Sequence, residues 1–130
     1  MTDTRAFPTR DVLSTITGRL MGDIGGVYEV LNFMTGESVY THQLPRLGRE
    51  ALPVVLAAHP ELAQAVEESE QVTPENFLYW RGTWEARYGL TIAVPKFTAD
   101  SHESIDPLSE LAQYVHPDKI VIVDVGKAKP

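Results

Sequence analysis

Apolar residues recur every three or four positions through the first half of the chain, a spacing typical of helices that bury one face. A first helix is expected over residues 9–21, where four apolar side chains share one side. A second is expected over residues 27–34. Gly36 marks its end, because glycine adopts the left-handed conformation of a helix terminus at little cost. The start of the chain is therefore predicted to be helical.

The third predicted helix, residues 44–58, contains a conflict. Its apolar spacing is helical, but Pro53 lacks an N–H and clashes with the preceding turn, so we expect a kink or two short helices. A later helix is expected to begin at Thr73-Pro74 and to end at Gly89. It carries an aromatic stripe, expected to belong to the core: Phe77, Trp80, Trp84 and Tyr88.

The pattern changes to strand-like towards the C-terminus. Residues 90–94 and 119–125 are rich in β-branched residues, and a helix is expected between them after Asp106-Pro107. A strand, a helix and a strand over residues 90–125 predict a βαβ-like crossover. A two-stranded sheet leaves edges with which a second copy of the chain can pair.

These elements predict an α+β fold that is mostly helical, with a C-terminal strand–helix–strand unit forming a small sheet. The 130 residues suit one domain spanning 1–130, with a short flexible N-terminus over about 1–7 and a tail over about 126–130. Hydrophobic residues make up 43% and charged residues 22%, which excludes a wholly disordered chain.

Several compartments and chemistries are disfavoured. The longest apolar runs, such as Leu52–Ala58, are too short to span a bilayer, and no apolar stretch follows the N-terminus as in a signal peptide. With no cysteine, the chain has no disulfide, thiol nucleophile or Cys-ligated metal. We therefore expect a soluble cytoplasmic domain without a membrane role.

Charge is unevenly distributed around a formal net value of −7. No Lys or Arg lies between Glu50 and Trp80, which argues against general nucleic-acid binding. An acidic face could attract a basic partner protein, or it could serve only as solvated surface. The acidic residues proposed for this face are Glu61, Glu67, Glu68 and Glu70.

A second candidate site lies at the start of the third helix and consists of His42, Gln43, Arg46 and Arg49. On a helix, the histidine and both arginines share one face, where forked guanidinium groups could hold a phosphate, a carboxylate or a partner's acidic group. Alternatively, the arginines pair with acids of the same chain, such as Glu37 or Glu50.

The remaining motifs do not predict catalysis. The glycines of residues 22–26 follow a helix rather than a strand and lack the Lys-Ser/Thr of a phosphate-binding loop. The segment from His102 to Asp106 has aspartate where a zinc-binding helix has its second histidine. We therefore expect no catalytic residues, metal or cofactor, and we lean against an enzyme.

Two stretches carry a family resemblance. The run VLSTITGRL, then GGVYEVLNFMTGE and THQLPR, and near the C-terminus IDPLSEL and VHPDKIVIV, resemble a group of small phage and prophage proteins of unknown function. The resemblance covers residues 9–66 and 105–123 but not the segment 67–104. It implies a phage-encoded accessory protein inside a bacterial host cell, and it brings no known ligand or catalytic residues.

Three functions remain open. The leading hypothesis is a non-enzymatic protein that binds a host or phage protein, such as an anti-CRISPR-like inhibitor of a host defence system. The alternative is a small domain that binds an anionic ligand, or an enzyme, using the His/Arg cluster. The third is a phage structural or assembly protein.

Overall fold

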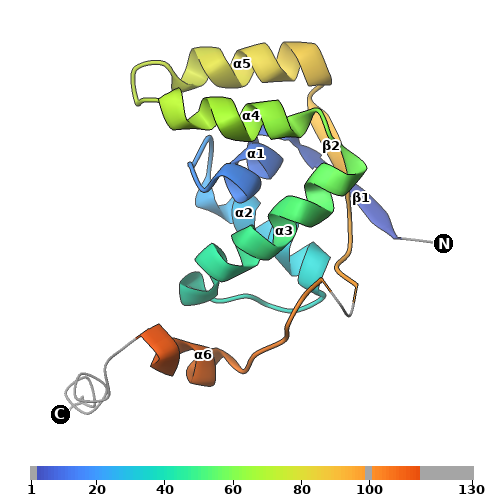
Figure 1. Cartoon of the computed structure of the whole chain (residues 1–130), viewed down its shortest axis with the longest axis vertical. Helices are drawn as coiled ribbons and strands as arrows, with labels where there is room; N and C mark the ends of the chain where they lie inside the picture. Colours follow the sequence, from blue (N-terminus) through green and yellow to red (C-terminus); the bar gives the residue numbers. More distant parts are fainter. Residues whose placement is uncertain (1–2, 99–100, 115–130) are drawn as a thin grey trace.

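A computed structural model describes residues 3–98 and 101–114 and has the predicted α+β class, mostly helical with a small sheet (Figure 1). In chain order, its elements are β1 (Thr4–Pro8), α1 (Thr9–Thr17), α2 (Ile24–Thr35), the 3-10 turn η1 (Thr41–Gln43), α3 (Leu44–Ala58), α4 (Leu62–Glu68), the 3-10 turn η2 (Ser69–Gln71), α5 (Phe77–Tyr88), β2 (Thr91–Pro95) and α6 (Pro107–Tyr114).

The centre of the fold is α1. It contacts α2, α3, α4, α5 and both strands, and its residues Val12, Leu13 and Ile16 are buried. A helix surrounded on all sides must be apolar or internally bonded. The hydroxyls of Ser14, Thr15 and Thr17 accordingly donate to backbone carbonyls one turn earlier, at 2.6–2.8 Å.

A close approach fixes α2 against α1. A Cβ added at Gly26 would lie 2.1 Å from the Oδ1 of Asp11, so only glycine allows the carboxylate to sit against the first turn of α2. Burial raises the pKa of Asp11. As predicted, α2 ends at Gly36, whose φ of 74° is left-handed.

The sheet joins the start of the chain to its second half. β1 pairs antiparallel with β2, with Ala6 opposite Ala93. The flexible N-terminus expected over residues 1–7 therefore overlaps a paired strand from Thr4 onward. β1 gives a weak sequence signal because only Phe7 is buried along it, and its partner lies more than 80 residues away.

The described sheet is not the predicted crossover. β2 agrees with the strand expected at residues 90–94, and α6 with the helix expected after Asp106, but β2 pairs with β1. The strand expected over residues 119–125 lies outside the described residues, so the strand–helix–strand unit is not confirmed. Figure 1 shows α6 apart from the sheet, at the opposite end of the molecule from α4 and α5.

The helices differ from expectation in their ends and at Pro53: α1 ends at Thr17 rather than near residue 21, and α5 begins at Phe77 rather than at Thr73-Pro74. α3 runs unbroken from Leu44 to Ala58 with Pro53 inside it, so two separate helices do not form. The aromatic stripe lies on α5, where Trp84 is buried and its three partners are partly buried against the core, as predicted. In the part of the chain that the structure describes, no helix combines the length and apolar character needed to cross a membrane.

Candidate functional site

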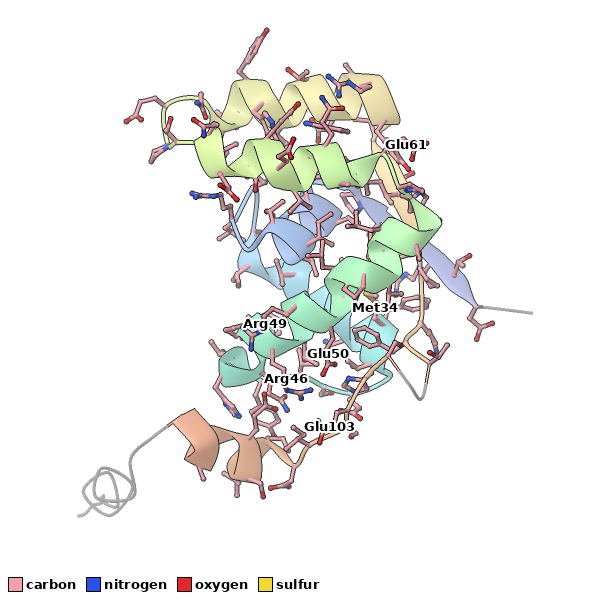
Figure 2. The ribbon with its side chains drawn as sticks, viewed as in Figure 1. Met34, Arg46, Arg49, Glu50, Glu61 and Glu103 are labelled. Atoms are coloured by element: carbon pink, nitrogen blue, oxygen red, sulfur yellow. The ribbon has the colours of Figure 1, made fainter. Side chains whose placement is uncertain are left out.

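Three of the four residues predicted as a cationic site come together where η1 leads into α3. His42, Gln43 and Arg46 all contact residues 101–114, which we call the arm: a short loop followed by α6. Figure 2 shows Arg46 and Glu50 on α3 next to Glu103 of the arm. The predicted cluster therefore faces another segment of the same chain.

Arg46 is held by two carboxylates and a carbonyl. Its Nε and Nη2 donate to the two carboxylate oxygens of Glu110, at 2.7 and 2.9 Å. Its Nη1 donates to Glu50 at 2.7 Å and to the carbonyl of Glu103 at 2.8 Å. These bonds use four of the five N–H groups of a guanidinium. Hydrogen bonding to Glu110 raises the pKa of Arg46, so the side chain stays charged.

Glu110 is the buried end of this pair. Its side chain is 0% exposed, while that of Arg46 is 14% exposed. Gln43 adds a bond from its Nε2 to Oε1 of Glu110 at 3.0 Å. A buried carboxylate needs such compensation because desolvation penalises its charge. The alternative in which Arg46 pairs internally is thus what the structure contains, and its main partner is Glu110, an acid of a neighbouring helix rather than Glu37.

Two backbone contacts fix the arm further. Nε2 of His42 donates to the carbonyl of Pro107 at 2.7 Å, because a carbonyl can only accept. Nε2 of Gln43 approaches the carbonyl of Ile105 at 3.4 Å, and its Oε1 accepts from the N–H of Tyr40 at 2.9 Å. These bonds set the position of the arm along α3.

A second polar cluster, which was not predicted from the sequence, holds the first residues of the arm against the body of the protein. Nδ1 of His102 lies 2.7 Å from Oε1 of Glu50, and its ring stacks on Phe97 at 4.9 Å. Ser104 donates to Glu37 at 2.7 Å. These side chains are separated by up to 67 residues, so no local pattern could have revealed the cluster. Among the described residues, no group of three or more His, Cys, Asp or Glu side chains is placed to hold a metal ion.

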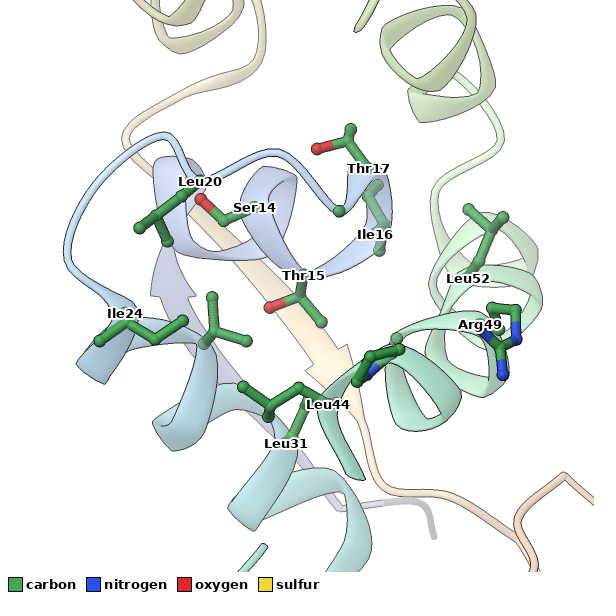
Figure 3. Close-up of a pocket in the computed structure, with 14 residues that line it drawn as sticks. Ser14, Thr15, Ile16, Thr17, Leu20, Ile24, Leu31, Leu44, Arg49 and Leu52 are labelled. Atoms are coloured by element: carbon green, nitrogen blue, oxygen red, sulfur yellow. The ribbon is translucent and has the colours of Figure 1, made fainter. Parts of the chain in front are cut away.

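Arg49 does not join the cluster. Its exposed side chain lines a groove of about 410 Å³ between α1, α2 and α3, beside Leu52 (Figure 3). The lining is mainly apolar, with Leu20, Ile24 and Leu44 around it, and Arg49 is the one charged residue among the described residues that line it. The groove therefore provides an apolar surface but no acid–base pair.

The predicted acidic face divides into exposed and engaged residues. Glu67 and Glu70 are exposed. Glu61 is exposed too, and accepts from the hydroxyl of Tyr88 at 3.3 Å. Glu68 instead turns towards α5. Only part of the predicted face is therefore free to meet a partner.

Glu68 joins α4 to α5 by accepting from two tryptophans. Its Oε1 lies 2.9 Å from Nε1 of Trp80 and 3.0 Å from Nε1 of Trp84, and Oε2 accepts from Gln64 at 2.8 Å. The indole donors stabilise the ionised carboxylate and lower the pKa of Glu68. The aromatic stripe thus supplies hydrogen bonds as well as apolar surface.

The comparisons with known proteins find one domain match, over less than half of the chain, and no activity. Residues 7–65 match DUF7736, a domain of unknown function. The match overlaps the region 9–66 of the resemblance, includes the residues from His42 to Arg49, and does not reach the arm. Neither a curated protein nor a solved structure matches the chain.

Proposed function

We propose that the chain is a non-enzymatic protein-binding domain that engages a basic partner protein through α4 and α5. The observation that carries this proposal is an exposed pair of large apolar side chains on α5, the helix that Glu68 joins to α4, where exposed acids lie. Leu78 and Tyr79 on α5 are 60% and 82% exposed. Aromatic residues are enriched in protein interfaces, and acids at the rim steer an oppositely charged partner.

The charge of α4 and of the segment that follows it supports a basic partner. Residues 51–79 contain no Lys or Arg, and Glu67 and Glu70 project into solvent there. A basic surface is what a protein that handles nucleic acid exposes to phosphates. An acidic surface can compete for it without binding nucleic acid itself.

The alternative role, binding a free anion or catalysing a reaction at the His/Arg cluster, has less support. Arg46 already donates hydrogen bonds to Glu110, Glu50 and the carbonyl of Glu103, and Arg49 lies on another face. This arrangement favours the binding role. No observation on the described residues supports the third hypothesis, a structural or assembly protein.

The biological setting belongs to the same proposal. The motifs that resemble small phage and prophage proteins support an accessory protein acting in the cytoplasm of a bacterial host. Its small size and acidity suit an inhibitor of a host defence complex, such as an anti-CRISPR-like protein. If so, expressing the chain in a CRISPR-immune strain restores plaque formation by the targeted phage. Unchanged immunity across CRISPR types would contradict this narrower role.

The binding surface is tested by rates measured on a purified partner. Candidates recovered from a bacterial lysate are purified and assayed singly against the chain, the double variant Glu67→Gln/Glu70→Gln, and Tyr79→Ala. The double variant should associate more slowly and with a flatter salt dependence, and Tyr79→Ala should dissociate faster. Glu29→Gln, an exposed acid on α2, is the matched control. Glu29→Gln should equal wild type, and rates equal to wild type in the double variant and in Tyr79→Ala as well would exclude α4–α5 as the interface.

A further inference from the structure

The contacts of the arm have the form of a peptide held in a receptor site. Ile105 and Pro107 offer backbone carbonyls to Gln43 and His42, and Glu110 inserts its carboxylate into the guanidinium fork of Arg46. We propose that His42, Gln43 and Arg46 form a receptor for an acidic, helix-starting segment, which the arm of the same chain occupies in cis. This site is independent of the α4–α5 surface.

The chemistry defines the ligand. Bonds to three carbonyls, those of Glu103, Ile105 and Pro107, do not depend on side-chain identity, so they set the position of the segment. The two-pronged bond to Glu110 selects a carboxylate three residues after the last of these carbonyls, because a guanidinium fork matches the geometry of a carboxylate. The ligand class is therefore a peptide that presents three carbonyls spaced two residues apart, and a glutamate three residues after the last of them.

The arm carries its own helix start, so it resembles a preorganised ligand. Oδ2 of Asp106 accepts from the N–H of Ser109 at 3.1 Å, and the carbonyl of Asp106 accepts from the N–H of Glu110 at 2.9 Å. The first turn of α6 is thus bonded within the arm rather than by α3. A segment that forms this turn alone loses less conformational entropy when it binds.

The arm is attached in a way that allows exchange. None of the apolar residues described in the arm belongs to the core or packs against it, and Leu108 is 75% exposed. Segments with few buried apolar contacts open at low free energy. The contacts of His102 with Glu50 and Phe97 keep the start of the arm attached to the body. Because α6 is linked in this way, it competes for the receptor at an effective concentration of about a millimolar. The tethered arm would thereby mask the receptor from segments of other chains.

The test uses the full chain and a labelled synthetic peptide of residues 101–114 as the probe. In the Glu110→Ala chain, the arm loses its carboxylate while the receptor stays intact. We expect this variant to bind the peptide at least about tenfold more tightly than wild type, because its own arm competes less well. The double variant Arg46→Met/Glu110→Ala should not bind, and neither should a peptide carrying Glu110→Ala. Glu103→Ala, which keeps the carbonyl bonded to Arg46, should behave like wild type.

The remaining outcomes are decisive against the proposal. A folded Glu110→Ala chain that fails to bind the peptide would show that the contact is only structural. Equal binding by the single and double variants would exclude Arg46 as the receptor. If the Glu110→Ala chain does not fold, amide hydrogen exchange of the wild-type chain tests the proposal instead. α6 amides that exchange only with global unfolding would show that the arm never leaves the receptor. None of these variants alters α4–α5, so the outcome is separate from that of the proposed partner surface.

Discussion

Glu68 and Glu67 are neighbours on α4 with opposite roles. Glu67 is exposed, whereas one oxygen of Glu68 accepts from the indoles of Trp80 and Trp84. Sequence alone places both in one acidic run, because composition does not reveal which acid faces α5. The distinction matters for any attempt to neutralise the acidic face, since changing Glu68 also changes the packing of two helices.

Replacing Glu68 with alanine should destabilise the fold, and the same change at Glu67 should not. Glu68→Ala leaves two indole donors without their acceptor, and each unpaired buried donor costs roughly 1–3 kcal/mol. Because the site is only partly buried, we expect each donor to cost near the lower value, which makes about 2 kcal/mol for the two donors together. Glu67→Ala should lie within about 0.5 kcal/mol of wild type. Urea unfolding followed by tryptophan fluorescence measures both, and equal free energies of unfolding would contradict the role of Glu68.

The lowered pKa of Glu68 also predicts a pH dependence. A carboxyl whose folded pKa lies below its usual 4.5 stabilises the fold fully above that value, and this contribution is lost as the pH falls through the folded pKa. The difference in unfolding free energy between wild type and Glu68→Gln should therefore shrink from about pH 6 to about pH 3. A difference that stays constant over this range would show that the indole bonds do not depend on the charge.

At the scale of elements, periodicity predicted most helices, and contacts distant in sequence decided the rest. α2 and α3 bury one face each and end where glycine or polar residues follow, so their spacing was sufficient. β1 was missed because a five-residue strand with one buried side chain has no readable alternation. The partner of Arg46 was missed because Glu110 lies 64 positions later, on a helix whose place beside α3 no local pattern specifies.

Cutting the link between α3 and α6 should release the arm without unfolding the body. Arg46→Ala removes the guanidinium from the buried carboxylate of Glu110, a change that costs roughly 3–5 kcal/mol if the carboxylate must stay buried. Since the arm is outside the core, α6 can detach, and the loss is then limited to its docking energy. Amide exchange in α6 should become fast while α1 keeps its wild-type protection.

The matched control for this change is Arg49→Ala. Arg49 lies on the same helix, is exposed, and forms no hydrogen bond or ion pair within the described part of the chain. Its loss should leave exchange in α6 unaltered. Faster exchange throughout α1 and α2 in Arg46→Ala would instead mean that the arm is part of the cooperative unit.

As a whole, the molecule places the two proposed interaction surfaces at opposite ends. The helices α4 and α5 form one end, and the arm lies at the other, with the α1-centred core between them (Figure 1). The run of acidic residues on and after α4 is visible in the sequence. The contact between the arm and α3 of the same chain is visible only in the structure. Pairing of two copies through the sheet stays a prediction: β1 has no strand neighbour other than β2 among the described residues.

The central claim, that the chain works by binding a basic protein through α4 and α5, is tested most directly by the footprint of a purified partner. Amide hydrogen exchange, compared between the free chain and the complex, reports which backbone segments a partner covers. The account predicts slower exchange over residues 61–88, with the groove beside Arg49 unchanged. Protection confined to that groove, with none on α4 or α5, would contradict it.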